Sequence, residues 1–533
     1  MKKRLTTLCL LFCVLALQAC DNENRKEADT TPPKPAIPSN YRIGIELSSQ
    51  INMHPAGIKA LQSIGINYIN YYINTFPDRS DLPAKEVNGF MMGIADKLDV
   101  EFSISSSVYD VPSSAVHDAL LRYEEKGRFR GILIDEFDHA RFIYPTSYGM
   151  ERSLIDRYAI KTIEEAHDAA LKAYADHIEM MKQWGVQEVV STNVWPVLND
   201  FAARCGYVVC PKICKELYSS VSMAIGLGAA KQYHTPFWND IDLWWWDQIP
   251  GHPAEEVKCN LLFSYWMGAD LTYLEGCGYN LYPAGKQGSS FSLFKITDSK
   301  NYQLTPIGET LKWFIHDYLP KHPRKWSARD VKPSIAIIRY EDSWFGQAQT
   351  PFGCPNVRID SDMSAWISIF NMLTFGATGD RCLTHPTPTE SHSFFHPMNG
   401  TVVYNEVVDY SLLKEIPLLF ITGKHISSTT MEAVKQCVTE GAVCVFWGNL
   451  AKVNGFGDWQ AGVRVLPYGK GKFIITDDFK NETVREIIAP FIGKQDEIKY
   501  KFGPDEVIFK RVDDNAIDVI INGEVQKWES FKN

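Results

Sequence analysis

The chain has 533 residues, of which 45% are hydrophobic and 22% are charged, as in ordinary globular proteins and unlike disordered chains. A chain of this length is expected to form about two to four domains. The formal net charge is −10 and no long basic stretch occurs, which argues against a nucleic-acid partner.

Residues 1–20 are typical of an export signal. A basic start is followed by an apolar run, residues 5–17, that is too short to remain as a membrane-spanning helix. The sequence Leu17-Gln18-Ala19-Cys20 resembles a bacterial lipobox, although Gln18 stands where a small residue is usual. We expect lipidation at Cys20, with plain secretory cleavage as the alternative. The chain is therefore predicted to be exported and anchored to a bacterial membrane, at the outer membrane or cell surface.

The residues that follow carry little sign of packed structure or of metal binding. Residues 21–40 are polar and contain four prolines, which predicts an extended tether. Nine cysteines follow Cys20, an odd number in a chain too large to need disulfides. Cys205, Cys210 and Cys214 are clustered, but their spacing fits no zinc motif and no histidine accompanies them. We expect buried free thiols, no metal and no cofactor.

From residue 41 to residue 320, short β-rich runs alternate with helical stretches, which is typical of βα units around a parallel sheet. Eight pairs over about 280 residues have the size of a (β/α)8 TIM-like barrel. The alternative, a nucleotide-binding doubly wound sheet, needs a glycine-rich first turn, which residues 48–52 lack. The predicted strands are 41–47, 66–73, 100–108, 130–137, 188–195, 207–216, 236–244 and 270–275. The predicted helices are 55–64, 85–98, 113–125, 151–184, 198–204, 219–233, 254–267 and 307–319.

A proline-bearing connector leads to a second alternating region, residues 333–494. Predicted strands at 334–340, 418–422, 443–447 and 472–476 alternate with helices at 363–373, 429–440 and 483–491. The pattern resembles a flavodoxin-like or glutamine-amidotransferase-like α/β domain. An amidotransferase needs a nucleophilic cysteine on a tight turn, and Trp447-Gly448-Asn449 has none. We therefore expect a non-catalytic accessory domain, followed by a small β domain at residues 495–533.

The carboxyl ends of barrel strands face the active site, and here they carry many acids and aromatics but few histidines. The strongest signal is the strand Gly131-Ile132-Leu133-Ile134, which runs into three acids, Asp135, Glu136 and Asp138. Burying charge is costly unless it is paired or used, so we expect at least one of them to be functional. The alternative is that they cap the next segment or pair with Arg141. Further candidates for contact with a substrate are Asn193, Trp195, Glu216, Asp240, Asp242, Trp244, Trp246 and Tyr273.

Carboxyl pairs and flat aromatic surfaces are what glycoside hydrolysis needs. Trp244 and Trp246 share one side of their strand, and with Trp238 they are predicted sugar platforms, although core packing would also account for each. Serine-hydrolase chemistry is disfavoured, because His139 is the one histidine beside a strand end and no serine in a nucleophile-like turn accompanies it.

The order of barrel, flavodoxin-like domain and small β domain resembles glycoside hydrolase family 42, within the clan A glycosidases. The resemblance implies an acid/base glutamate after an asparagine on strand four, and a nucleophilic glutamate on strand seven. Glu136 matches the acid/base, with Asp135 in place of the asparagine. The seventh predicted strand has no glutamate, and the nearest strand-end glutamate is Glu275. Either the strand count is one too high, or the nucleophile lies on strand eight, or Asp240 or Asp242 takes the role; we favour Glu275.

The prediction is a retaining glycosidase that acts on an oligo- or polysaccharide. Glu136, with its pKa raised by Glu275 and Asp135, would protonate the leaving oxygen while Glu275 attacks the anomeric carbon. The family resemblance also implies a trimer built through the accessory domain. The alternatives are a non-catalytic glycan-binding lipoprotein and a polysaccharide lyase. A lyase would want arginine, lysine or a metal against the uronate, where the strand ends offer mainly acids.

Overall fold

The computed structural model describes residues 34–48, 55–72, 94–105, 127–143, 153–183, 185–186, 188–193, 198–214, 218–243, 252–275, 293–340, 350–378 and 393–531. The residues from Pro35 onward form one compact unit. The export signal, Cys20 and most of the tether lie outside the described residues, as do four candidate substrate contacts: Trp195, Glu216, Trp244 and Trp246. Within the described part, no helix is both long and apolar enough to cross a membrane.

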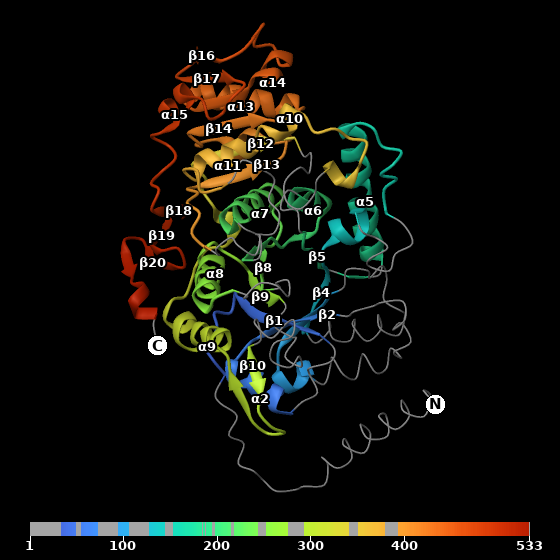
Figure 1. Ribbon diagram of the computed structural model, residues 1–533, viewed down its shortest axis with the longest axis vertical. Coiled ribbons are helices and arrows are strands. Elements are labelled where there is room, and N and C mark those ends of the chain that lie inside the picture. Colours follow the sequence, from blue (N-terminus) through green and yellow to red (C-terminus); the bar gives the residue numbers. More distant parts are fainter. Residues whose placement is uncertain are drawn as a thin grey trace. The chain divides into compact units, whose positions relative to one another are not determined.

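The first sheet is parallel throughout, and its strand pairing is that of an eight-stranded barrel. Figure 1 shows several of its strands, among them β1, β4 and β8. Its hydrogen-bonded order is β6-β5-β4-β3-β2-β1-β9-β8-β7. The two ends of this order, β6 and β7, are consecutive halves of one strand, interrupted at Cys210 and Pro211 because proline has no N–H to donate. A further parallel bridge joins Val209 to Phe237. The strands are β1 (Arg42–Ser48), β2 (Tyr68–Tyr72), β3 (Glu101–Ser105), β4 (Phe129–Ile134), β5 (Val189–Ser191), β6 (Val208–Val209), β7 (Lys212–Cys214), β8 (Trp238–Asp242) and β9 (Leu271–Glu275).

The predicted TIM-like barrel is thus confirmed, with all eight strands in the predicted order. β9 pairs with both β1 and β8, so it is the eighth strand. The possibility that the strand count was one too high is therefore wrong, and Glu275 lies on strand eight.

The helices of the barrel are α2 (Pro55–Ile64), α5 (Ile163–Gln183), α6 (Asn199–Cys205), α7 (Ser219–Tyr233), α8 (Ala254–Trp266) and α9 (Pro306–Trp313). The prediction placed the start of α5 about twelve residues too early. Thr162 and Glu165 form a capping box, in which the Glu165 carboxylate accepts from the Thr162 N–H and the Thr162 hydroxyl accepts from the Glu165 N–H, so the helix begins only there. The predicted helix 113–125 lies outside the described residues, and that at 85–98 is described only from residue 94.

The second sheet has the order β13-β12-β14-β15-β17-β16, in which β16 alone is antiparallel. A first strand flanked by the second and third is the flavodoxin-like order, as predicted. The four predicted strands correspond to β12 (Ile335–Arg339), β14 (Leu418–Thr422), β15 (Val443–Trp447) and β17 (Gly471–Thr476), whereas β13 (Thr401–Tyr404) and β16 (Val463–Tyr468) were not predicted. The helices around this sheet include α11 (Ile367–Leu373), α13 (Ser428–Glu440) and α15 (Glu482–Ile488).

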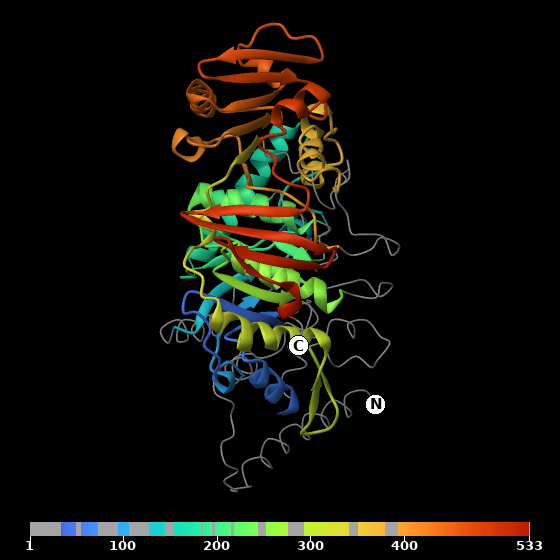
Figure 2. The ribbon, with the colours of Figure 1, turned by 90° about the vertical axis from the view of Figure 1, so that its left-hand side faces the viewer.

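A small antiparallel sheet ends the chain, as predicted. It consists of β18 (Glu497–Phe502), β19 (Asp505–Asp513), β20 (Ala516–Ile521) and β21 (Glu524–Gln526). Figure 2 shows this sheet in red beside α8 of the barrel. Phe263 of α8 packs edge-to-face on Phe509 of β19, with ring centroids 5.1 Å apart.

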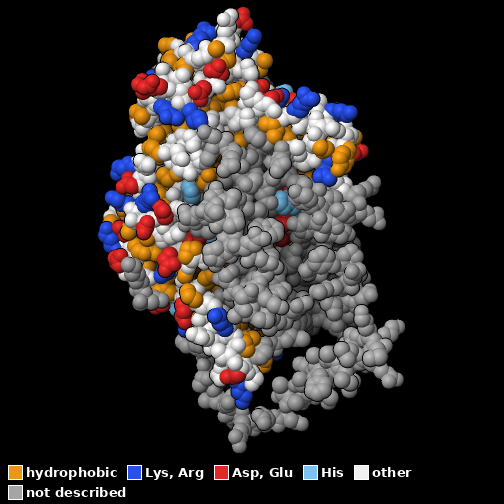
Figure 3. Space-filling view, viewed as in Figure 1, with side chains coloured by type: hydrophobic (Ala, Val, Ile, Leu, Met, Phe, Trp, Pro, Cys, Tyr) orange, Lys and Arg blue, Asp and Glu red, His pale blue; other side chains and the backbone are white. Residues whose placement is uncertain are grey.

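Two barrel helices join the barrel to the second sheet. Almost every residue of α7 is buried, because its outer side packs against β13. At Gly228 the backbone of α7 approaches the Val403 carbonyl so closely that a Cβ would lie 1.8 Å from its oxygen. In α6, Asp200 forms a fully buried ion pair of 2.9 Å with Arg339 of β12. On the face drawn in Figure 3, acidic and basic side chains are interspersed over the second domain.

Candidate active site

The barrel interior holds a cluster of buried apolar and aromatic side chains, followed toward the carboxyl ends of the strands by a group of acids. The cluster includes Trp238 of β8 and Tyr273 of β9. Residues two apart on a strand point the same way, so Asp240 and Asp242 follow Trp238 into the interior, and Glu275 follows Tyr273. The acids therefore lie at the carboxyl ends of the strands, where TIM barrels hold their active sites.

Lys212 of β7 lies at the centre of these acids. Its side chain has no exposed surface, and its Nζ contacts five carboxylates from three strand ends. The oxygens lie at 2.7 Å (Glu275), 3.1 Å (Asp135), 3.5 Å (Asp242), 3.6 Å (Glu136) and 3.9 Å (Asp240). The structure thus brings both predicted catalytic glutamates, Glu136 and Glu275, to one ammonium group.

The sequence analysis missed Lys212. It took the end of strand six to be near residue 216, whereas β7 ends at Cys214. The available signal was a lysine inside an otherwise apolar run, Val208-Val209-Cys210-Pro211-Lys212-Ile213-Cys214. A buried lysine in such a run needs carboxylate partners, and the predicted acids could have supplied them.

Burial and mutual repulsion raise the pKa values of these acids. Burial raises the pKa of Asp240 to about 7. Burial, followed by the charges of Asp240 and Asp242, holds the pKa of Glu275 well above its ordinary value, and Lys212 opposes that shift. Glu46 of β1 belongs to the same group, since burial and then Glu275 raise its pKa. Burial in this cluster therefore favours the protonated forms of these carboxyl groups.

The acids around Lys212 favour the charged form of its ammonium group. Burial alone would lower the pKa of its ammonium group, but the surrounding carboxylates, Asp135 first and Glu275 next, raise that pKa well above its ordinary value. The lysine is therefore a buried positive charge surrounded by these acids.

A strained turn presents Glu136. Its φ is +47°, which is uncommon for a residue other than glycine and is found disproportionately at functional sites. The Thr192 hydroxyl, just beyond β5, holds the turn, because it donates to Asp135 at 2.9 Å and accepts from the Glu136 N–H at 3.3 Å. The side chain of Glu136 is 16% exposed and that of Glu275 is 11% exposed, whereas Asp240 and Asp242 have no exposed surface.

The two glutamates lie close together. Glu136 Oε1 and Glu275 Oε2 contact the same Nζ, at 3.6 and 2.7 Å, so these oxygens are separated by at most about 6.3 Å. Retaining glycosidases hold their two carboxyl groups ~5–5.5 Å apart, and inverting ones ~6.5–9.5 Å.

Other predicted contacts have mainly internal partners. The Tyr273 hydroxyl donates to Asp240 at 2.8 Å beneath the acids, and Trp238 is buried in the same apolar and aromatic cluster, so it is not a sugar platform. Asn193 accepts from the Tyr174 hydroxyl at 2.6 Å. Asp138 is buried near Tyr174 and is not one of the acids that contact Lys212.

The described cysteines agree in part with the prediction of buried free thiols. The described cysteines are all free, and all but Cys205 are buried. The sequence showed no histidine near Cys214, but the fold brings His252 and Glu256 to it, so that the potential ligand atoms of the three lie within 4.8 Å of one another.

No protein-family model matches the chain, and no curated protein matches it. Similar solved structures include an exo-β-1,4-mannosidase from Opitutaceae bacterium strain TAV5, with 10% identity and a TM-score of 0.44 over 82% of this chain and 92% of that one. An apo family 42 exo-carrageenase from Bacteroides ovatus has 11% identity and a TM-score of 0.43, over 90% and 74%. A family 30 subfamily 8 xylanase from Clostridium acetobutylicum has 10% identity and a TM-score of 0.32, over 53% and 72%. Because these TM-scores are below 0.5, the barrel is assigned from its strand pairing.

Proposed function

We propose that the chain is a glycoside hydrolase that cleaves O-glycosidic bonds of an oligo- or polysaccharide with retention of configuration. One observation carries the proposal: Glu136 and Glu275 share one ammonium group at the carboxyl end of a closed barrel. The two oxygens that contact Lys212 are at most about 6.3 Å apart, which favours the close spacing of retaining enzymes over the wider spacing that makes room for a water molecule in inverting ones.

Glu136 is proposed as the acid/base, because it is the most exposed member of the cluster. It would protonate the leaving oxygen and later take a proton from the water that resolves the glycosyl-enzyme. Glu275 is proposed as the nucleophile. The ammonium of Lys212, 2.7 Å away, opposes the rise in the pKa of its carboxyl group, and its exposed edge distinguishes it from Asp240 and Asp242, which are fully buried.

Two alternatives fit the cluster less well. A lyase must neutralise the carboxylate of a uronate, but Lys212, the cation that the described residues place in this cluster, is already shared among five acids. A glycan-binding protein without activity would not need a pair of carboxyl groups at one end of the barrel, such as Glu136 and Glu275 around Lys212.

The test replaces each glutamate by glutamine. We expect Glu136→Gln and Glu275→Gln each to lower kcat/KM by roughly 10²–10⁴-fold, measured on the aryl glycosides and polysaccharides that wild type cleaves. Glu101→Gln is the matched control, because Glu101 begins β3 at the opposite end of the barrel and pairs with Arg42 at 2.8 Å. It should keep wild-type turnover.

A second substrate separates the two roles. A dinitrophenyl glycoside releases a phenolate that needs no proton, so Glu136→Gln should still form the glycosyl-enzyme from it and Glu275→Gln should not. If wild type binds glycans but cleaves none across the panel, the binding-protein alternative holds. Wild-type turnover in both variants would remove the two glutamates from the mechanism.

A further inference from the structure

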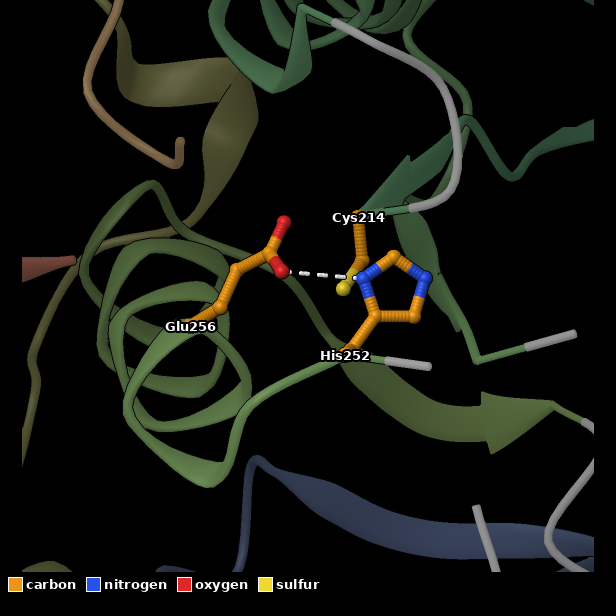
Figure 4. A group of neighbouring side chains, drawn as sticks. All are labelled: Cys214, His252 and Glu256. Carbon is orange, nitrogen blue, oxygen red and sulfur yellow. Dashed lines mark hydrogen bonds and ion pairs between the residues drawn. The ribbon is translucent and has the colours of Figure 1, made fainter. Parts of the chain in front are cut away.

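Three side chains of metal-ligating types converge at the end of β7. Cys214 is the last residue of that strand, Glu256 lies in the first turn of α8, and His252 stands two residues before that helix. Figure 4 shows the three side chains pointing toward one another. One sulfur, one imidazole nitrogen and one carboxylate oxygen lie within 4.8 Å of one another, and all three residues are buried.

Rigid elements hold this group from both sides. His252 lies just before α8, and its Nδ1 lies 2.9 Å from Oε2 of Glu256 in the first turn of that helix. On the other side, Cys214 has a φ of +79°, and its N–H donates to the Ser219 hydroxyl at 3.1 Å. The thiol is therefore placed by a strand end and the other two groups by a helix start.

The ligand set is suited to zinc. Zn²⁺ binds cysteine sulfur at ~2.3 Å and histidine nitrogen or carboxylate oxygen at ~2.0–2.2 Å, in tetrahedral geometry. Neighbouring ligand atoms around such an ion are therefore roughly 3–4 Å apart. Groups already within 4.8 Å of one another need only small side-chain movements to reach that spacing.

The surroundings favour a cation. Cys214 pairs in register with Asp242, a fully buried acid of the Lys212 cluster. Glu256, whose carboxylate is one of the three converging groups, is a second buried acid beside the thiol. A divalent ion would offset these acids and take the sulfur as a thiolate, with release of one proton.

A thiol nucleophile is the other chemistry that these residue types offer. In a catalytic thiol–imidazole pair, the carboxylate forms a hydrogen bond with one ring nitrogen, and the thiol forms one with the other ring nitrogen. Here Glu256 holds Nδ1, and Figure 4 shows the Cys214 sulfur on the Nδ1 side of the ring as well. A thiol and a carboxylate that lie on the same side of the ring, next to one ring nitrogen, fit a shared ion better than a nucleophile and its base.

We propose that Cys214, His252 and Glu256 bind one Zn²⁺ ion at the carboxyl end of the barrel, next to the acids around Lys212. Three protein ligands leave a fourth position for water or for a sugar hydroxyl, as in catalytic rather than structural zinc sites. The proposal does not depend on the hydrolase function, since metal binding is measured without a substrate.

The first test measures zinc content. Untagged full-length chain is dialysed against buffered Zn²⁺, and bound metal is counted by elemental analysis. We expect about one ion per chain in wild type and in the control Cys444→Ser, a buried thiol of β15 in the second domain. Cys214→Ser and Glu256→Gln should each weaken Zn²⁺ affinity at least about tenfold. Wild type with less than a tenth of an ion per chain, or Cys214→Ser that binds like wild type, would overturn the proposal.

A second measurement needs no variant to fold. Co²⁺ replaces Zn²⁺ in such sites, and a thiolate ligand then gives an intense sulfur-to-cobalt charge-transfer absorption. We expect that band, together with the visible transitions of tetrahedral Co²⁺, in Co²⁺-loaded wild type. Loaded wild type without the thiolate band would exclude Cys214 as a ligand, whatever the turnover on glycosides.

Discussion

A single lysine makes the acid cluster of this barrel possible. Five carboxylates lie within 3.9 Å of Lys212 Nζ, and each would be costly to bury without an opposite charge. By the same contacts the lysine sets the orientation of Glu136 and Glu275. It is therefore a positioning residue that acts on both proposed catalytic groups.

Replacing Lys212 by methionine should destabilise the fold in a pH-dependent way. At pH 8 the free energy of unfolding should fall by about 3–5 kcal/mol, because the variant leaves buried carboxylates without their counter-charge. A carboxyl group whose folded pKa is raised, such as Asp240 at about 7, costs no stability below its unfolded pKa and costs more as pH rises through its folded pKa. The difference between wild type and variant should therefore shrink toward pH 5, as measured by urea unfolding at both pH values.

Lys231 of α7 provides the control, since its ammonium donates to the Arg329 carbonyl at 3.4 Å. Lys231→Met should change stability by the same amount at pH 5 and pH 8. A Lys212→Met deficit that is as large at pH 5 as at pH 8 would contradict the description of the cluster as buried acids with raised pKa values around one cation.

At the scale of elements, the barrel could be predicted because short β-rich runs alternate regularly with helical stretches along the chain. The same periodicity predicted Glu136, Asp240, Asp242 and Glu275 at strand ends. It failed for Lys212, because Pro211 interrupts the strand and the lysine follows the break. It also failed for β16, an edge strand that contains Pro467 and has no fully buried residue, so that no hydrophobic pattern marks it.

The packing of α7 against β13 cannot be predicted from periodicity either. α7 is apolar on every side, which predicts burial but does not name the partner. Gly228 marks the point of contact between α7 and β13, because the close approach of the Val403 carbonyl leaves no room for a Cβ.

Gly228→Ala should therefore destabilise the chain. Helix propensity alone would make alanine stabilising by about 1 kcal/mol at this position. The clash with the Val403 oxygen forces α7 away from β13 and should reverse that sign, with an expected net loss of about 1–3 kcal/mol in urea unfolding. Because the two effects have opposite signs, a variant more stable than wild type would show that the helix does not pack on β13 in this way.

At the scale of the whole molecule, the sequence predicted three regions in order but not their mutual packing. Besides the packing of α7 on β13, three pairs of side chains join the barrel to the second sheet. Asp200 pairs with Arg339 in full burial, Arg204 pairs with Glu406 at 3.3 Å, and Gln232 donates to Asn405 at 2.6 Å. Such partners are far apart in sequence, so local patterns do not reveal them. They place residues 35–533 in one compact unit.

Tight packing between the barrel and the second sheet predicts a single cooperative unfolding transition. Large chains often unfold domain by domain, but here Arg339 of the second sheet neutralises an acid inside the barrel's own helix layer, so neither region can unfold without leaving a buried charge in the other. We expect equal calorimetric and van't Hoff enthalpies for wild type.

Arg339→Met should keep that single transition and lower the free energy of unfolding by about 3–5 kcal/mol, because Asp200 loses its partner. Asp200→Asn combined with Arg339→Met should recover part of the loss, since the uncompensated charge is then gone. Two separate transitions in wild type, with Arg339→Met lowering only one of them, would mean that the barrel and the second sheet are independent folding units.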